Sequence, residues 1–335
     1  MSRKWPSRER LLDMAADFQV ACVMGAAAEL DLWTAIGRDR LSAQQVAERL
    51  GADPRATAML LDAVAALNVL DKQDSLYRVP ISLRPLLSST SPQSVLPMVW
   101  HRMNILRGWA QLAWVVKSGR PAERVASLRG AEADRAAFMA AMHTVSVSIA
   151  DDLVAQLMPL EFEHLLDVGG ASGTWTLAFL RAVPGAIATI FDLPDAIQQA
   201  QARLAESGLG DRIRLAPGDF YTDELPPGTD FAWVSAIAHQ HDRPRNRELF
   251  RKVFAALRPG GRIAVRDIVM EPSRTRPTEG ALFAINMLVN TETGGTFTFE
   301  EFAEDLQSAG FTEPELRIKT EDMRSVVMAR KPLAN

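Results

Sequence analysis

The segment that most restricts the fold is the run from His164 to Gly173, which reads HLLDVGGASG. Its apolar first half predicts a buried strand, and its glycines predict a turn into a helix. A second apolar stretch ends in Phe191-Asp192-Leu193-Pro194 and predicts another strand with a carboxylate at its end. Glycines let a backbone approach a ligand where a Cβ would clash, and a carboxylate can accept hydrogen bonds from both ribose hydroxyls. The two segments together predict a crevice that holds a nucleoside.

Strands and helices are predicted to alternate from Leu165 onward. The expected strands are 165–168, 188–192, 213–217, 231–236 and 262–269, and the expected helices are 174–183, 195–207, 245–257, 278–291 and 299–309. This alternation predicts an α/β fold with a mostly parallel sheet covered on both faces. Two strand-like runs, 313–319 and 324–329, are separated only by a short turn. They therefore predict an antiparallel hairpin at the end of the sheet.

The first part of the chain is predicted to be helical. Apolar residues recur at helical spacing over 11–28 and lie all round the helix, which indicates burial against a second chain. A helix is expected over 41–51 with Ser42 as its N-cap, and another over 54–70. The stretch 71–79 predicts a short hairpin. Helix, turn, helix and hairpin in this order form a winged-helix pattern.

Composition excludes several classes of function. The 335 residues are 47% hydrophobic and 23% charged, which fits a globular enzyme, and the net charge of −4 offers no basic field to a nucleic acid. Arg55 is the only basic residue over 54–70, although phosphate contacts need several. Cys22 is the only cysteine, which excludes an internal disulfide and a multi-cysteine zinc site. The polar N-terminus and the lack of a run of about 18 apolar residues predict a cytoplasmic protein without membrane contact.

The glycine pattern carries a family resemblance. The motif from Asp167 to Gly173, D-x-G-G-x-x-G, does not fit the dinucleotide fingerprint G-x-G-x-x-G. It resembles the cofactor loop of class I S-adenosylmethionine-dependent methyltransferases, as do the closing hairpin and Gly218-Asp219-Phe220. The turn 258–262, the FDLP motif at 191–194 and the segment 293–302 narrow the resemblance to small-molecule O-methyltransferases, similar to the caffeate and hydroxyindole (acetylserotonin) enzymes, of bacterial type.

The resemblance implies a domain organisation and a partner. We expect a winged-helix dimerisation domain at 1–98, bridging helices at 99–160 and a Rossmann-like catalytic domain at 161–335. It implies a homodimer in which each N-terminal part helps to close the partner's acceptor site. No nucleic acid or membrane partner is expected.

The resemblance also implies S-adenosylmethionine as the cofactor, S-adenosylhomocysteine as the product and no metal. The expected cofactor residues are Asp167, Gly169, Gly170 and Gly173 around the methionine part, Asp192 and Leu193 at the ribose, Asp219 and Phe220 at the adenine, and Ser235 nearby. An alternative for Asp192 is the N-cap of the helix 195–207.

Two histidines follow the fourth strand of the predicted sheet, where ligands of such folds bind. Either His239 or His241 could take a proton from an acceptor, because the ordinary imidazole pKa lies near 6.5. The resemblance favours His239, and a structural or surface role is the alternative for each. Asp267 matches an acidic residue that orients the histidine in the family. Its alternative role is an ion pair with Arg266.

Residues of two helices are predicted to form the acceptor pocket. They are Phe138, Met142 and His143 on one helix, and Phe283, Asn286, Met287 and Asn290 on the other. Apolar stripes at helical spacing are otherwise typical of a core. Asn286 and Asn290 lie one turn apart and suggest a polar group for a phenol or carbonyl oxygen. An apolar pocket with few polar groups fits a flat aromatic, quinone-like or polyketide acceptor.

The sequence departs from the family pattern at three places. Plant members carry a second glutamate where this chain has Thr296-Phe297-Thr298, a lysine is common at Ser235, and a glycine is common at Ala171. We expect an S-adenosylmethionine-dependent O-methyltransferase with a histidine base. The alternative is a relative that binds the cofactor and catalyses hydroxylation, decarboxylation or cyclisation.

Overall fold

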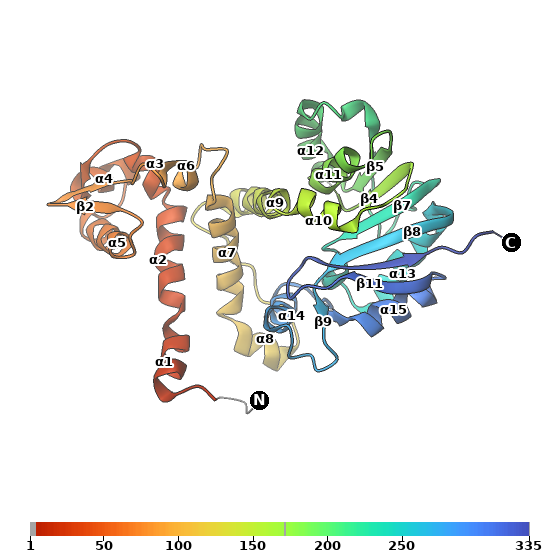
Figure 1. Cartoon of the computed structure of the whole chain (residues 1–335). Helices are drawn as coiled ribbons and strands as arrows, with labels where there is room; N and C mark the ends of the chain where they lie inside the picture. The colour runs from red at the N-terminus through yellow and green to blue at the C-terminus, as the bar shows by residue number, and fades with distance from the viewer. Residues whose placement is uncertain (1–4, 171, 335) are drawn as a thin grey trace. The chain divides into compact units, whose positions relative to one another are not determined.

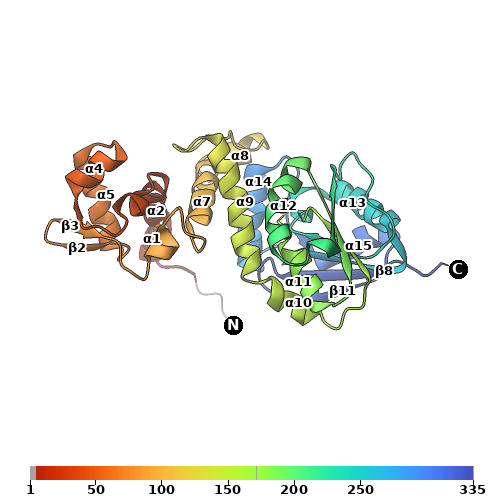
Figure 2. The same cartoon turned by 90° about the horizontal axis from the view of Figure 1, so that it is seen from above.

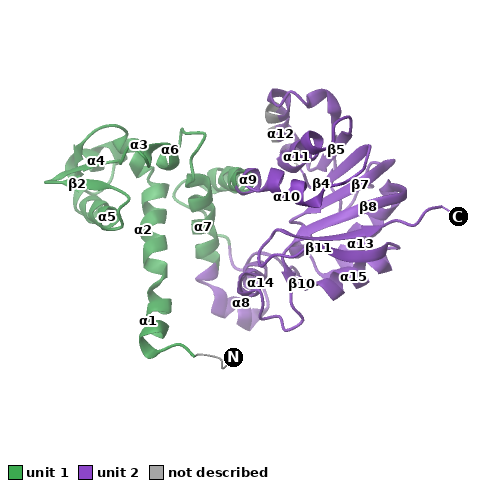
Figure 3. Cartoon of the chain, in the orientation of Figure 1, with its two compact units in different colours: residues 1–108, 124–144 green, residues 109–123, 145–335 purple. Residues whose placement is uncertain are grey.

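The computed structural model describes residues 5–170 and 172–334, and the chain forms two compact units (Figures 1 and 3). Unit 1 comprises residues 1–108 and 124–144, and unit 2 comprises residues 109–123 and 145–335. The domain boundaries after residues 98 and 160 stay a prediction.

Unit 1 contains helices around a small antiparallel sheet. Its elements are α1 (Arg8–Ala16), α2 (Phe18–Glu29), α3 (Leu32–Ile36), β1 (Leu41–Ser42), α4 (Ala43–Leu50), α5 (Pro54–Ala66), β2 (Asp71–Gln73), β3 (Leu76–Arg78), α6 (Arg84–Leu87), most of α7 (Leu96–Trp109) and most of α9 (Ala131–Val147). The strands are paired in the order β1-β3-β2. A core that includes Trp33, Leu61 and Trp100 lies between these elements.

Local sequence explains how the helices of unit 1 begin and end. Ser42 and Gln45 form a capping box at the start of α4, and Gly51 ends it with a left-handed φ of 61°. The expected helix 54–70 instead ends at Ala66, because Asn68 adopts a left-handed φ of 60° that a helix cannot continue. The expected single helix over 11–28 is divided by a turn at Asp17.

The stretch Arg8–Glu29 corrects the expectation about apolar segments. Among the described residues, it is long and apolar enough to cross a membrane by length and composition, with 17% of the apolar window buried. The bent pair Ala131–Val147 and Ala150–Leu157 passes the same test if it is counted as one span. The sequence does not show this stretch as one apolar run, because Asp13 and Asp17 interrupt it. Its many alanines nevertheless raise its mean hydropathy. Core helices and signal sequences pass this test as well.

Unit 2 contains a seven-stranded sheet in the order β11-β12-β8-β7-β4-β5-β6. The strands are β4 (His164–Val168), β5 (Ile187–Asp192), β6 (Ile213–Pro217), β7 (Thr229–Ser235), β8 (Leu257–Asp267), β11 (Thr312–Ile318) and β12 (Ser325–Arg330). Strands β4 to β8 are parallel, whereas β12 pairs antiparallel with both β8 and β11. The predicted fold class is therefore confirmed. A separate pair is formed by β9 (Val269–Met270) and β10 (Phe297–Thr298).

Helices cover both faces of this sheet (Figures 1 and 2). They are α10 (Ala150–Leu157), α11 (Thr174–Ala182), α12 (Pro194–Glu206), α13 (Arg243–Ala256) and α15 (Phe299–Ser308). Two further helices, α8 (Leu112–Ser118) and α14 (Thr278–Asn290), contact each other, and α14 contacts β9. One core contains β7 and β8 residues with Phe250 of α13 and Phe302 of α15. Phe179 of α11 and Trp233 belong to the core on the other face. The five parallel strands therefore end at one edge, where the loops that follow them meet.

Candidate cofactor and active site

The loop after β4 contains the glycines predicted to approach the cofactor. Gly169 and Gly173 have left-handed φ values of 70° and 68°, which favour glycine. The Gly169 N–H donates to the Phe191 carbonyl at 2.8 Å, which connects the loop to β5. A Cβ on Gly173 would lie 2.4 Å from a methyl carbon of Leu204. The loop is therefore closely packed against its neighbours, and only glycine fits at positions 169 and 173. Ala171 lies outside the described residues.

Asp167 lies at the base of this loop and is 1% exposed. Thr176 of α11 donates to one carboxylate oxygen at 2.6 Å, whereas Oδ1 has no hydrogen-bond partner within the described part of the chain. Burial, the largest cause, raises the pKa of Asp167 to about 7. The carboxyl group therefore connects the end of β4 to the first turn of α11, and its pKa lies near neutral pH.

This raised pKa predicts a pH-dependent stability that Asp167→Asn should remove. Between about pH 4 and 7 the native carboxyl keeps a proton that the unfolded chain has lost, so the wild type loses stability as pH rises. Relative to Asp167→Asn, this loss should amount to about 1.4 kcal/mol for each pH unit and should stop above pH 7. Urea unfolding of both proteins at pH 5, 6, 7 and 8 measures it. Parallel pH profiles would contradict the prediction.

The carboxylate of Asp192 ends β5 beside the glycine loop. Its Oδ1 accepts the N–H of Leu193 at 2.7 Å, and Leu193 is 51% exposed. Leu193, not Asp192, occupies the N-cap position of α12. The alternative role of Asp192 as a helix cap is therefore wrong.

Asp219 and Phe220 lie in the loop after β6. Both are half-buried, and Phe220 packs against the core beneath the sheet edge. The Asp219 N–H donates to the Asp223 carboxylate at 2.8 Å, and Asp219 Oδ1 accepts the Tyr221 N–H at 2.9 Å. Ser235 ends β7, where its hydroxyl accepts from Arg266 Nε at 2.7 Å.

His239 and Asp267 form a buried pair at the same edge. Nδ1 of His239 lies 3.0 Å from both carboxylate oxygens, and the backbone N–H of His239 donates to Asp267 Oδ2 at 3.1 Å. The two residues are 7% and 2% exposed. A proton on Nδ1 that faces the carboxylate leaves Nε2 as the acceptor. Asp267 is therefore paired with His239, while Arg266 bonds Ser235 and the Met323 carbonyl.

Two further contacts fix the His239 ring and backbone. The Gly295 N–H donates to the His239 carbonyl at 2.9 Å, and a Cβ on Gly294 would lie 2.5 Å from that carbonyl oxygen. Phe283 of α14 meets the imidazole edge-on, with ring centroids 4.9 Å apart at 89°. The GG turn and Phe283 thus hold His239 from two sides.

His241 points to different partners. Its ring nitrogens lie 3.1 and 3.2 Å from the Tyr221 hydroxyl. Burial, with the charge of Arg245 as the second cause, lowers the pKa of His241 to about 4. The imidazole is therefore neutral near neutral pH and belongs to the cluster around the β6 loop, whereas His239 has the carboxylate that an acid–base histidine needs.

The predicted acceptor residues fall in both units. Phe138, which is 44% exposed, Met142 and His143 belong to unit 1, and Phe283, Asn286, Met287 and Asn290 belong to unit 2. Within unit 2, Asn286 Oδ1 accepts from Trp109 Nε1 and from Asn290 Nδ2, each at 3.0 Å. Met287 is buried. The carbonyl oxygen of Asn286 is therefore already used, and its amide nitrogen is the group left to contact a ligand.

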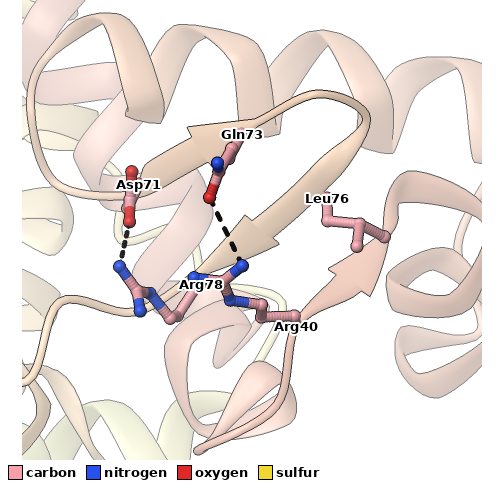
Figure 4. Close-up of a pocket in the computed structure, with 5 residues that line it drawn as sticks. All are labelled: Arg40, Asp71, Gln73, Leu76 and Arg78. Atoms are coloured by element: carbon pink, nitrogen blue, oxygen red, sulfur yellow. Dashed lines mark hydrogen bonds and ion pairs between the residues drawn. The ribbon is translucent and has the colours of Figure 1, made fainter.

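Two cavities lie away from these residues. One, of about 10 Å³, is lined by Arg40, Asp71, Gln73, Leu76 and Arg78 in the small sheet of unit 1 (Figure 4). Its arginines bond Gln73 and Asp71, and it has room for about one water molecule. The other, of about 410 Å³, lies at the amino ends of the strands, beside Glu163 and Asp230. Among the described residues, no group of three or more His, Cys, Asp or Glu side chains is placed to hold a metal.

The sequence did not indicate several residues that hold the predicted site residues in place. They are Thr176 on Asp167, Tyr221 on His241, and Lys252 on the β6 loop, and each belongs to a different element from its partner. No local motif marks them. The GG turn was recognised from the family pattern, but not its hydrogen bond to the His239 carbonyl.

Known proteins resemble this chain over most of its length. The O-methyltransferase domain matches residues 105–312, and the O-methyltransferase dimerisation domain matches residues 10–79. The chain is 29% identical to 3-hydroxy-5-methyl-1-naphthoate 3-O-methyltransferase of Streptomyces sahachiroi, over 90% of this chain and 89% of that protein. It is 31% identical to acetylserotonin O-methyltransferase of Gallus gallus, over 94% of each. Human N-acetylserotonin methyltransferase in complex with SAM has a similar structure, with a TM-score of 0.80, 27% identity, and coverage of 99% of this chain and 100% of that one.

The sheet order, the glycine loop after β4 and the antiparallel strand β12 define the Rossmann-like fold of class I methyltransferases. The chain belongs to the O-methyltransferase family and is an S-adenosylmethionine-dependent O-methyltransferase.

Proposed function

We propose that this enzyme methylates a hydroxyl group of an aromatic, quinone-like or polyketide small molecule, with His239 as the general base. The observation that carries the proposal is the buried His239–Asp267 pair at the carboxyl edge of the sheet. The chemistry of its relatives supports the acceptor class, since one is named for a hydroxynaphthoate and another for tetracenomycin polyketide synthesis.

The residues around the β4 loop fit S-adenosylmethionine. A Cβ on Gly169 would lie 2.4 Å from a side-chain carbon of Ile237, so this side of the loop backbone packs directly against the protein. We assign Asp167, Gly169, Gly170 and Gly173 to the methionine part, Asp192 and Leu193 to the ribose, Asp219 and Phe220 to the adenine, and Ser235 to the same cleft. When bound, S-adenosylmethionine supplies an activated methyl group on a sulfonium.

The His239–Asp267 pair would handle the acceptor's proton. Asp267 accepts the Nδ1 proton and so leaves Nε2 free to take the proton of the acceptor hydroxyl. The carboxylate then stabilises the imidazolium that forms. A positioned base of this kind contributes roughly 10²–10⁴-fold to a rate.

We also propose that Phe138, Met142, His143, Phe283, Asn286, Met287 and Asn290 contact the acceptor. Phe283 supports this for the unit 2 set, because its ring touches His239. The amide nitrogen of Asn286 can donate to a phenol or carbonyl oxygen. This small number of polar groups in apolar surroundings fits a flat acceptor.

The chain is expected to form a homodimer through its N-terminal helices. Leu11, Leu12, Met14, Phe18 and Val20 are 52–59% exposed along α1 and α2, within the dimerisation domain. Burial of such side chains contributes about 1.5–3 kcal/mol each, so Phe18→Arg should shift the mass in solution from dimer towards monomer at micromolar concentration. Light scattering after size exclusion measures it. Leu333→Arg, at an exposed apolar position of unit 2, is the control, and a wild-type monomer would refute the homodimer.

Methyl transfer is tested with S-adenosylmethionine that carries a labelled methyl group, against phenols, hydroxyquinones and hydroxylated polyketides. Label in the acceptor together with S-adenosylhomocysteine supports the proposal. Consumption of an acceptor without label, while the cofactor stays intact, would favour the non-methylating alternative, which the segment Thr296-Phe297-Thr298 motivates because it lacks the second glutamate.

A further inference from the structure

Lys252 of α13 is bonded to the backbone of the β6 loop. Its Nζ donates to the carbonyl oxygens of Phe220 at 2.9 Å, Tyr221 at 3.0 Å and Asp223 at 3.1 Å. An ammonium group has three N–H donors, so this loop uses all of them. Three carbonyl dipoles that point to one spot repel each other unless a cation lies between them.

The loop also contains hydrogen bonds of its own. The N–H groups of Thr222 and Asp223 both donate to the Asp219 carbonyl, at 3.0 and 2.7 Å. The Asp223 carboxylate accepts the Asp219 N–H, and the Tyr221 hydroxyl bonds His241. The loop is therefore folded back on itself, with Lys252 closing it from α13.

We propose that Lys252 is a positioning residue for cofactor binding, which orders the loop carrying Asp219 and Phe220 before S-adenosylmethionine arrives. The inference rests on the proposed function of these two residues at the adenine. A loop that is ordered in the free protein loses less conformational entropy on binding, and this preorganisation raises affinity. Lys252 itself need not touch the cofactor.

Lys252→Met tests the proposal, because methionine keeps an apolar stem and removes the donors. We expect the Kd for S-adenosylmethionine, measured by calorimetry, to rise by about tenfold or more, because the loop loses three hydrogen bonds from a charged donor. At saturating cofactor kcat should stay within about twofold, because the reacting groups are unchanged. Lys252→Arg should recover part of the affinity.

Lys331→Met is the matched control. Lys331 Nζ also donates to backbone carbonyls, those of Phe254 at 2.6 Å and Leu257 at 2.7 Å, at the C-terminal end of α13. The Lys331→Met variant should have a lower Tm than the wild type and an unchanged Kd for S-adenosylmethionine. Equal Kd values for Lys252→Met and wild type would overturn the proposal, as would equal weakening by both lysine variants.

Hydrogen exchange separates this proposal from the proposed function. In the cofactor-free Lys252→Met protein, the amides of Tyr221, Thr222 and Asp223 should exchange about tenfold faster than in the wild type. Failure of the wild type to bind S-adenosylmethionine would refute the function assigned to the loop. Unchanged exchange rates would refute the ordering role of Lys252.

Discussion

Replacing His239 by alanine should lower kcat by about 10²–10⁴-fold and leave the Kd for S-adenosylmethionine nearly unchanged. The variant removes Nε2, the atom that would take the acceptor's proton, and leaves the glycine loop after β4 intact. Asp267 would also lose the Nδ1–H donor at 3.0 Å, although the backbone N–H of residue 239 still bonds it. Single-turnover rates and cofactor titrations of the same preparation measure the two effects.

Two comparison variants sharpen this test. Asp267→Asn keeps the shape of the side chain but can favour the wrong tautomer of His239, so it should also reduce kcat while sparing cofactor affinity. His241→Ala should act mainly on cofactor affinity through Tyr221. A His239→Ala enzyme with the wild-type rate would show that the acceptor reacts without this base, and a rate lost only in His241→Ala would identify His241 instead.

Gly170→Ala should weaken S-adenosylmethionine binding by roughly 5–150-fold. A Cβ on Gly170 would lie 2.2 Å from the carboxyl carbon of Asp167, which is buried and held by Thr176. Overpacking of this kind costs about 1–3 kcal/mol, and the shift it forces moves the loop that contacts the cofactor. Gly170 is not one of the described glycines that have a left-handed φ. The expected loss of affinity therefore comes from steric overlap and not from backbone strain.

Gly210→Ala is the control for this substitution. The nearest atom to its Cβ would be a carbonyl oxygen at 3.7 Å, and we expect an unchanged Kd for the cofactor. A double variant, Asp167→Ala with Gly170→Ala, should lose less affinity than the sum of the single variants, because the first change removes the group that the new methyl would strike. Additive losses, or wild-type affinity in Gly170→Ala, would contradict the mechanism.

Much of the fold of unit 2 could be predicted because its signals are local. Short apolar runs marked β4 to β7 to within two residues, and glycine or proline follows or ends the first three; β6, for example, spans Ile213–Pro217 as expected. Strand β8 begins at Leu257, five residues before the expected Arg262, because Leu257 already pairs with Thr229 of β7. The register then shifts, and pairing with β7 resumes at Arg262.

Helix breaks were harder to predict. Apolar spacing predicts one helix over 99–116 and another over 135–158, but the first is α7 followed by α8 and the second is α9 followed by α10. Gly108 precedes the first break, whereas no proline or glycine marks the second, at Ser148 and Ile149. Tertiary packing decides such breaks, and propensity is too weak to show them.

The sequence predicted the residues assigned to the cofactor and the acceptor, but not the residues that orient them. Asp167 and Asp192 lie near the carboxyl ends of strands, and His239 follows one. The carboxyl ends of parallel strands share one edge, so the proximity of these residues follows from the order of elements. The groups that orient them come from other elements. Thr176, Gly295 and Lys252 act through single hydrogen bonds or backbone contacts that leave no trace in residue spacing.

The position of β12 has a consequence for synthesis of the protein. It lies between β8 and β11, so the last strand along the chain fills the interior of the sheet. A nascent chain on the ribosome therefore exposes the open edge of β8 until residues 325–330 have emerged, although Asp267 at the end of β8 has been made long before. Until then this edge can pair with a strand of another chain, which opens the nascent protein to association through β8.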